Sequence, residues 1–198
     1  MAKNKYQHND DGTTFIFLET KNKYFPGKHT AIIDTEDWDK IKVYRWHLHG
    51  GKNYTTAYVR GLIPNPDKDI NRPRNYTLIL LHRLILGKPS KGMVTDHINH
   101  NGLDNRKENL RFATRGQNQQ NRRAGKNSSS QYLGVSWINQ HQLWQAMIRH
   151  NGKRYYLGSF TCEHQAALAY NKKAKELHGE FANLNVINMP EDNNKKIM

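Results

Sequence analysis

The segment VTDHINHNGLDNRKENLRFATRGQNQQNRR, residues 94–123, contains the side chains best suited to chemistry. Asp96 and His97 place a carboxylate next to an imidazole, and Asn109 and Asn118 add two amides. A histidine can take a proton from water near neutral pH, and carboxylate and amide oxygens are ligands for Mg²⁺ or Mn²⁺. Hydrolysis of a phosphodiester needs a base for the water and a cation for the leaving oxygen. The segment therefore points to phosphodiester hydrolysis.

These side chains need a β-hairpin and a helix to bring them together. The pattern predicts strands over residues 94–98 and 110–113, joined by an Asn/Gly/Asp loop. Thr114 stands at a helix N-cap position with Gln117 three residues later, so we expect a helix over residues 115–123. Neighbouring side chains of a regular strand point to opposite faces. Asp96 and His97 can thus serve one site only where the strand ends or twists.

Simpler interpretations exist for several of these residues. Asp-His-Ile-Asn alone favours a turn, and Asn105 and Asn109 are more often loop-capping residues than catalytic ones. The combined spacing changes this balance in favour of a nuclease site. His82 and Arg83, upstream, are equally compatible with helix packing and with a phosphate contact.

The stretch DHINHNGLDNRKENLRFAT with the later Asn118, preceded by LHRLILGKP, resembles the HNH endonuclease family. The similarity is to the zinc-free branch found in phage and intron homing enzymes. It implies that His97 is the general base, that Asp96 and Asn118 are ligands of Mg²⁺ or Mn²⁺, and that Asn109 fixes the loop and orients His97. Many HNH nucleases have histidine where this chain has Asn118, and asparagine is expected in the homing branch.

The composition indicates a polyanionic partner. The formal net charge is +14, and the one cysteine, Cys162, excludes an internal disulfide and a cysteine-bound zinc site. No apolar run reaches the roughly 18 residues of a membrane span, and the first residues lack a secretory signal. We therefore expect a cytoplasmic protein, a monomer or weak dimer without an evident protein partner, that binds double-stranded DNA. The arginines expected to contact DNA near the site are Arg83, Arg111, Arg115, Arg122 and Arg123.

The sequence pattern of the C-terminal region predicts a sheet that is covered by one helix. Two alternating segments flank Asn151-Gly152, a strong hairpin signal. Alternation places Ala146 and Ile148 on one face and Met147 and Arg149 on the other. Residues 132–138 supply another strand, and apolar residues recur at helical spacing from 163 to 178.

The pattern YLGVSW…LWQAMI…YYLGSF…EHQAALAY…HGEFANLN resembles the plant APETALA/ethylene-response-factor DNA-binding domain. Such domains lay a three-stranded sheet in the major groove. The resemblance implies a DNA-facing surface that includes Ser136, Arg149, Arg154 and Tyr156. Several arginines of the plant pattern are replaced here, for example by Ser136, so the plant target sequence is not assumed.

Together these patterns predict an α+β protein with five parts. They are a β-rich N-terminal region with a short helix (1–90), a ββα-metal HNH nuclease core (91–123), a linker (124–131), a three-stranded antiparallel sheet packed on one helix (132–185), and a tail (186–198). The expected function is a phage homing endonuclease that nicks one DNA strand, since each chain has one site. The alternatives are a catalytically silent DNA-binding regulator that keeps the HNH shell as a scaffold and, less favoured because no RNP-type motif is found, an RNA-binding protein.

Overall fold

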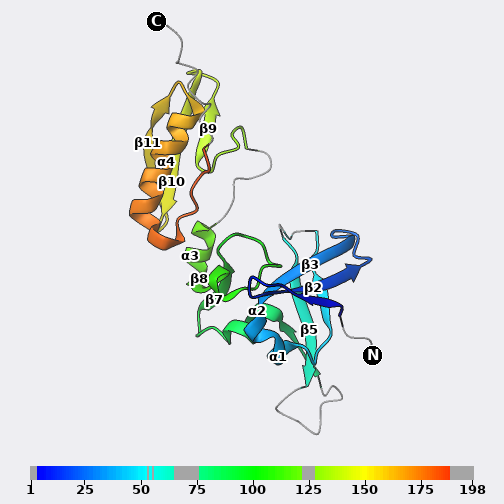
Figure 1. Cartoon of the computed structure of the whole chain (residues 1–198). Helices are drawn as coiled ribbons and strands as arrows, with labels where there is room; N and C mark the ends of the chain where they lie inside the picture. The colour runs from blue at the N-terminus through cyan, green and yellow to red at the C-terminus, as the bar shows by residue number, and fades with distance from the viewer. Residues whose placement is uncertain (1–3, 53, 55, 65–75, 122–127, 188–198) are drawn as a thin grey trace, which may run out of the picture. The chain divides into compact units, whose positions relative to one another are not determined.

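The computed structural model describes residues 4–52, 54, 56–64, 76–121 and 128–187. The chain forms two compact units, Met1–Arg115 and Gly116–Met198, in which small antiparallel sheets are combined with short helices (Figure 1). The mixed α and β composition agrees with the sequence-based expectation.

The first unit begins with a three-stranded sheet of order β1-β2-β3. On β2, residues Thr14, Ile16 and Leu18 are buried while Phe17 is exposed, which is the alternation expected of a strand with one covered face. The elements are β1 (Tyr6–His8), β2 (Thr13–Thr20), β3 (Gly27–Asp34), η1 (Thr35–Asp37) and α1 (Trp38–Ile41).

A second sheet, of order β4-β5-β6, completes the core of this unit. Its elements are β4 (Trp46–His49), β5 (Tyr58–Pro64), β6 (Tyr76–Leu80) and the following α2 (Leu81–Leu86). Leu81 and Ile85 of α2 pack into one buried cluster with Ile16, Trp46 and Val59. Both sheets therefore share a core with α2, and this core supports the hairpin that follows.

The ββα segment is formed by a hairpin and a short helix. Its strands are β7 (Met93–His97) and β8 (Leu110–Thr114), with η2 (Lys107–Asn109) before β8 and α3 (Arg115–Gln120) directly after it. The boundary between the two compact units falls inside α3.

The second unit contains the predicted sheet and helix. β9 (Val135–Ile138), β10 (Leu143–His150) and β11 (Lys153–Phe160) form a sheet of order β11-β10-β9, followed by α4 (Glu163–His178) and η3 (Gly179–Phe181). Small alanines, Ala166, Ala167 and Ala174, are fully buried on α4, which lets the helix lie close to the sheet. Ala146 and Ile148 of β10 are buried in the same clusters, whereas Arg149 is exposed.

Several element boundaries differ from the sequence-based expectation. The strand predicted over residues 132–138 starts at Val135, because Gly134 adopts a positive φ of 74°. The helix predicted over 115–123 is α3, which ends at Gln120, and Arg122 and Arg123 lie outside the described residues.

Candidate active site

Asp96 and His97 are the last two residues of β7. In the β7–β8 register Asp96 lies opposite Arg111, and His97 lies opposite Leu110. Both side chains are only 6% exposed. The end of the strand thus buries two consecutive polar side chains.

The carboxylate of Asp96 forms an ion pair with Arg111 on the neighbouring strand. Arg111 Nε and Nη2 lie 3.0 and 2.9 Å from the same oxygen, Asp96 Oδ2. Arg111 is 13% exposed, so the pair is largely shielded from water. Such shielding strengthens the attraction and raises the cost of separating the charges.

The imidazole of His97 lies among aromatic rings. Its centroid is 5.0 Å from that of His82, edge to face, and 5.6 Å from that of Tyr58. Burial lowers the pKa of His97, and this is opposed by the side chain of Asn105 and by the charges of Asp96 and Asp104. Near neutral pH the ring is therefore neutral, which is the form that accepts a proton.

His82 of α2 is the second buried imidazole. Burial first, then the charges of His97 and Arg83, lower the pKa of His82 to about 3. Its Nδ1 has no hydrogen-bond partner among the described residues. Helix packing and a phosphate contact were both open for residues 82 and 83. His82 is buried in the packing of α2, whereas Arg83 is exposed.

Asn109 closes the loop between the two strands. Its amide nitrogen donates to the Asp104 carbonyl at 2.8 Å, and its side-chain oxygen accepts from the Asn99 backbone at 2.9 Å. The Ile98 backbone N–H also donates to the Asn109 carbonyl. The loop that follows His97 is thus held from its far end.

The first sheets support the same loop. The backbone of Ile32 in β3 exchanges hydrogen bonds with Leu103 and Asn105. Gly102 donates to the Thr56 hydroxyl, and a Cβ at Gly102 would lie 2.3 Å from the Ala57 carbonyl oxygen. The N-terminal region, whose role the sequence pattern did not indicate, therefore helps to hold this loop beside His97.

The donor chemistry fits an oxygen-preferring divalent cation. Asp96 offers a buried carboxylate. Asn118, the second ligand expected from the sequence, is exposed in the part of α3 that belongs to the second unit. Among the described residues no group of three His, Cys, Asp or Glu side chains could hold a metal ion. A cation bound here would complete its shell with amide, water or phosphate oxygens, as Mg²⁺ usually does.

The basic residues near the hairpin fall into two classes. Arg83 and Arg115 are exposed. Arg111 is paired with Asp96, and two other basic residues of the same segment, Arg106 and Lys107, form ion pairs with Asp104 and Asp37 respectively. The sequence pattern did not distinguish the arginines that solvent reaches from those that hold the fold together.

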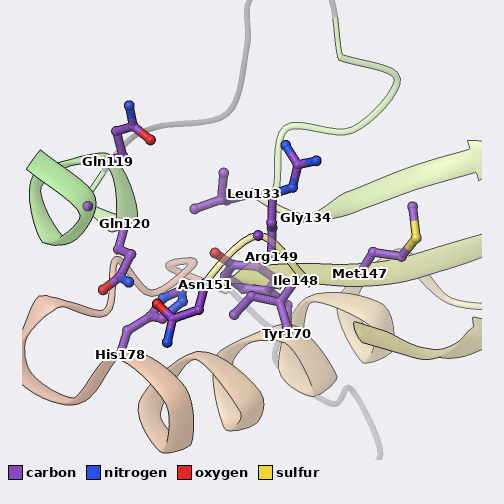
Figure 2. Close-up of a pocket in the computed structure, with 12 residues that line it drawn as sticks. Gln119, Gln120, Leu133, Gly134, Met147, Ile148, Arg149, Asn151, Tyr170 and His178 are labelled. Carbon is purple, nitrogen blue, oxygen red and sulfur yellow. The ribbon is translucent and has the colours of Figure 1, made fainter. Parts of the chain in front are cut away.

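In the second unit Arg149 and Arg154 lie opposite each other on β10 and β11, and both are exposed. Tyr156, also exposed, bonds through its hydroxyl to Ser159, and Ser136 is half-buried on β9. A cavity of about 310 Å³ adjoins this region and is lined by residues that include Arg149, Asn151 and His178 (Figure 2). No sequence motif indicated this cavity.

Comparison with known proteins covers nearly the whole chain. The family model for HNH endonucleases matches residues 80–120. An uncharacterized HNH endonuclease of Acanthamoeba polyphaga mimivirus is 36% identical over 183 residues, which are 90% of this chain and 89% of that protein. Protein 3.8 of Escherichia phage T7 is 32% identical over 96 residues, 48% of this chain and 78% of its own length.

A partial similarity concerns plant proteins. An AP2-like ethylene-responsive transcription factor of Arabidopsis thaliana is 38% identical over 66 residues, 33% of this chain but only 14% of that protein. No solved structure matches the chain. In the part of the chain that is described, no helix has the length and apolar character needed to cross a bilayer. On the strength of its match along almost the full length of the viral relative, the chain belongs to the HNH endonuclease family.

Proposed function

We propose that the protein is a divalent-metal-dependent DNA endonuclease in which His97 is the general base. The observation that supports this most directly is the buried imidazole of His97, whose pKa is lowered by burial, directly after the carboxylate of Asp96 at the end of β7. Asp96 and Asn118 are the proposed ligands of Mg²⁺ or Mn²⁺. The bound cation would stabilise the charge that develops on the leaving oxygen.

The protein's own groups account for the remaining steps. His97 accepts a proton from the attacking water, and the charges of Asp96 and Asp104 favour the imidazolium that results. Tyr58 and His82 confine the ring, while Asn109 and Ile32 hold the loop that follows it. A positioned base of this kind contributes about 10²–10⁴-fold to a reaction rate.

We further propose that the second unit binds double-stranded DNA through the exposed face of its sheet. Arg149, Arg154 and Tyr156 are the main candidates, with Ser136 at the edge of the same surface. α4 packs on the opposite face of the sheet, where Ala146 and Ile148 of β10 are buried. The face that carries the arginines is left open to a ligand. The partial similarity to plant transcription factors supports the same assignment.

With one site per chain, the proposed product is a nick in one strand, and a role in homing is the proposed biological context. The test is incubation of supercoiled plasmid and phage DNA with Mg²⁺ or Mn²⁺. We expect nicking by the wild type, a loss of about 10²–10⁴-fold in His97→Ala, and no change in His47→Ala, where an exposed histidine is removed from β4.

A catalytically silent DNA-binding regulator is the alternative function. It predicts that wild type and His97→Ala retard DNA equally in gels and that neither produces nicked circles with any divalent cation. Equal nicking by both proteins would instead show that His97 is not the base.

A further inference from the structure

The ion pair between Asp96 and Arg111 is built into the hairpin that carries the proposed metal ligand. The two residues are directly opposite each other in the β7–β8 register. The guanidinium contacts Oδ2 of the carboxylate twice, from Nε at 3.0 Å and from Nη2 at 2.9 Å. The rigid planar fork of an arginine fixes a carboxylate in orientation as well as in charge.

This arrangement disfavours the binding of a divalent cation to Asp96. A cation that binds Asp96 comes within a few ångströms of the positive guanidinium, and the low exposure of both side chains limits the screening of their repulsion. The same burial means that Asp96 without Arg111 would be a poorly compensated charge. Arg111 therefore stabilises the carboxylate and at the same time opposes its use as a metal ligand.

We propose that Arg111 is a resident counter-ion of Asp96 that holds the carboxylate in place and weakens the binding of the divalent cation in the absence of DNA. The inference rests on the proposed function in one respect, the assignment of Asp96 as a metal ligand. It changes the role expected for Arg111, since the charge pattern alone suggested a direct DNA contact.

One consequence is that metal and DNA reinforce each other's binding. A DNA phosphate near Asp96 adds negative charge that offsets the repulsion between the cation and Arg111. Because coupling between two ligands is reciprocal, DNA would raise the affinity for the cation by the same factor by which the cation raises the affinity for DNA. Free protein would hold Mg²⁺ weakly and load it mainly on its substrate.

The test measures Mn²⁺ binding to the full DNA-free chain, by calorimetry and by the paramagnetic resonance signal of free Mn²⁺. Arg111→Gln removes the charge but keeps hydrogen-bond donors, and we expect it to bind Mn²⁺ about tenfold more tightly than the wild type. Arg111→Lys keeps the charge and should stay within about threefold of the wild type. Unchanged or weaker binding by a folded Arg111→Gln would overturn the proposal, because a purely structural arginine would only misplace Asp96 when removed.

Asp96→Asn separates this proposal from the assignment of the site. If the wild type and Asp96→Asn bind Mn²⁺ alike, Asp96 is not a metal ligand, and the proposed site fails together with the role of Arg111. If Asp96→Asn loses binding but Arg111→Gln gains none, only the role of Arg111 fails.

A measurement on the wild type covers the case in which Arg111→Gln does not fold. The Nε–H resonance of Arg111, assigned by its absence in Arg111→Lys, should shift as Mg²⁺ is added, because a cation on the Asp96 carboxylate weakens the hydrogen bond from Nε to Oδ2. A resonance that stays unchanged while Mg²⁺ saturates the protein would contradict the proposal.

Discussion

Asp96 and His97 are neighbours in sequence, yet their buried side chains meet different partners. Asp96 turns to Arg111 across the hairpin, whereas His97 turns to the rings of Tyr58 and His82. The alternation of a strand is therefore kept, and the two residues are linked electrostatically, since the charge of Asp96 acts on the pKa values of both His97 and Tyr58. The proposed pairing of a base with a metal-binding carboxylate therefore depends on this position at the very end of β7.

Asn109 is expected to matter through the loop that follows His97. Asn109→Ala removes the hydrogen bonds to the Asp104 carbonyl and the Asn99 backbone, and the first of these satisfies a carbonyl of the buried residue Asp104. We expect a loss of about 1–3 kcal/mol in the free energy of unfolding and a fall of about tenfold or more in the single-turnover nicking rate. Urea unfolding and rapid-quench assays measure the two effects. Substitution of the exposed Asn101 by Ala is the control for a general effect of changing the loop, and an unchanged rate in Asn109→Ala would contradict a positioning role.

His82 makes stability depend on pH. Its pKa is about 3 in the folded protein, below the ordinary histidine value of about 6.5. Between pH 6.5 and 3 the unfolded chain therefore binds a proton at this residue while the folded chain does not. The contribution of His82 to the free energy of unfolding is thus present above about pH 6.5 and is lost as the pH falls. Between pH 7.5 and 5 the contribution lost is about 2 kcal/mol. His82→Phe keeps a ring beside His97 without a titrating group and should remove that part of the dependence in urea titrations; a dependence equal to that of the wild type would show that another residue causes it.

Helices and turns that are marked by residues close together in the sequence were predicted correctly. The short helix expected within residues 1–90 is α2, and it ends at Gly87, whose φ of 95° suits few other residues. The turn at Asn151-Gly152 and the helix from Glu163 to His178 were predicted for similar reasons. These features depend on residues close together in the chain.

The surroundings of His97 could not be predicted in the same way. Thr56 bonds to Gly102 across 46 residues of sequence, and Ile32 holds the loop through its backbone, which leaves no mark in the side-chain pattern. Arg111 belongs to a run of basic residues that resembles a DNA-binding surface. Its pairing with Asp96 follows from the hairpin register, and the register depends on the long loop as much as on the strands.

Gly134 is expected to be essential to the second unit. Its φ is 74°, and a Cβ there would lie 2.2 Å from the Tyr170 ring and 2.5 Å from the Met147 carbonyl oxygen. Gly134→Ala should destabilise this unit by about 3 kcal/mol or more, because backbone strain is added to overpacking. Gly152→Ala is the matched control, since Gly152 has a similar φ of 78° with no atom within 4 Å of a Cβ, and it should cost only about 1–2 kcal/mol. Thermal unfolding of the two variants compares them, and equal losses would mean that the contact with Tyr170 is unimportant.

The affinity for DNA and its dependence on salt are expected to depend on the paired arginines of the sheet. Arg149 and Arg154 lie on adjacent strands at one register position and are both exposed, so a duplex on this face would meet them together. If each neutralises one phosphate, each alanine variant should lower the slope of log K against log salt concentration by about 1. Fluorescence anisotropy with a labelled duplex at several salt concentrations gives the slopes.

The control for these two variants lies on the other side of the same sheet. Lys172→Ala removes one exposed positive charge from α4, the helix that packs on the buried face, and should leave the slope nearly unchanged. If the three variants lower the slope equally, the net charge of +14 attracts DNA without a defined surface. We expect a double variant Arg149→Ala/Arg154→Ala to bind DNA less tightly but to nick at an unaltered rate under saturating DNA. Removing a binding contact changes the affinity and leaves the chemical step intact, so this result would separate DNA binding by the sheet from the proposed cleavage site.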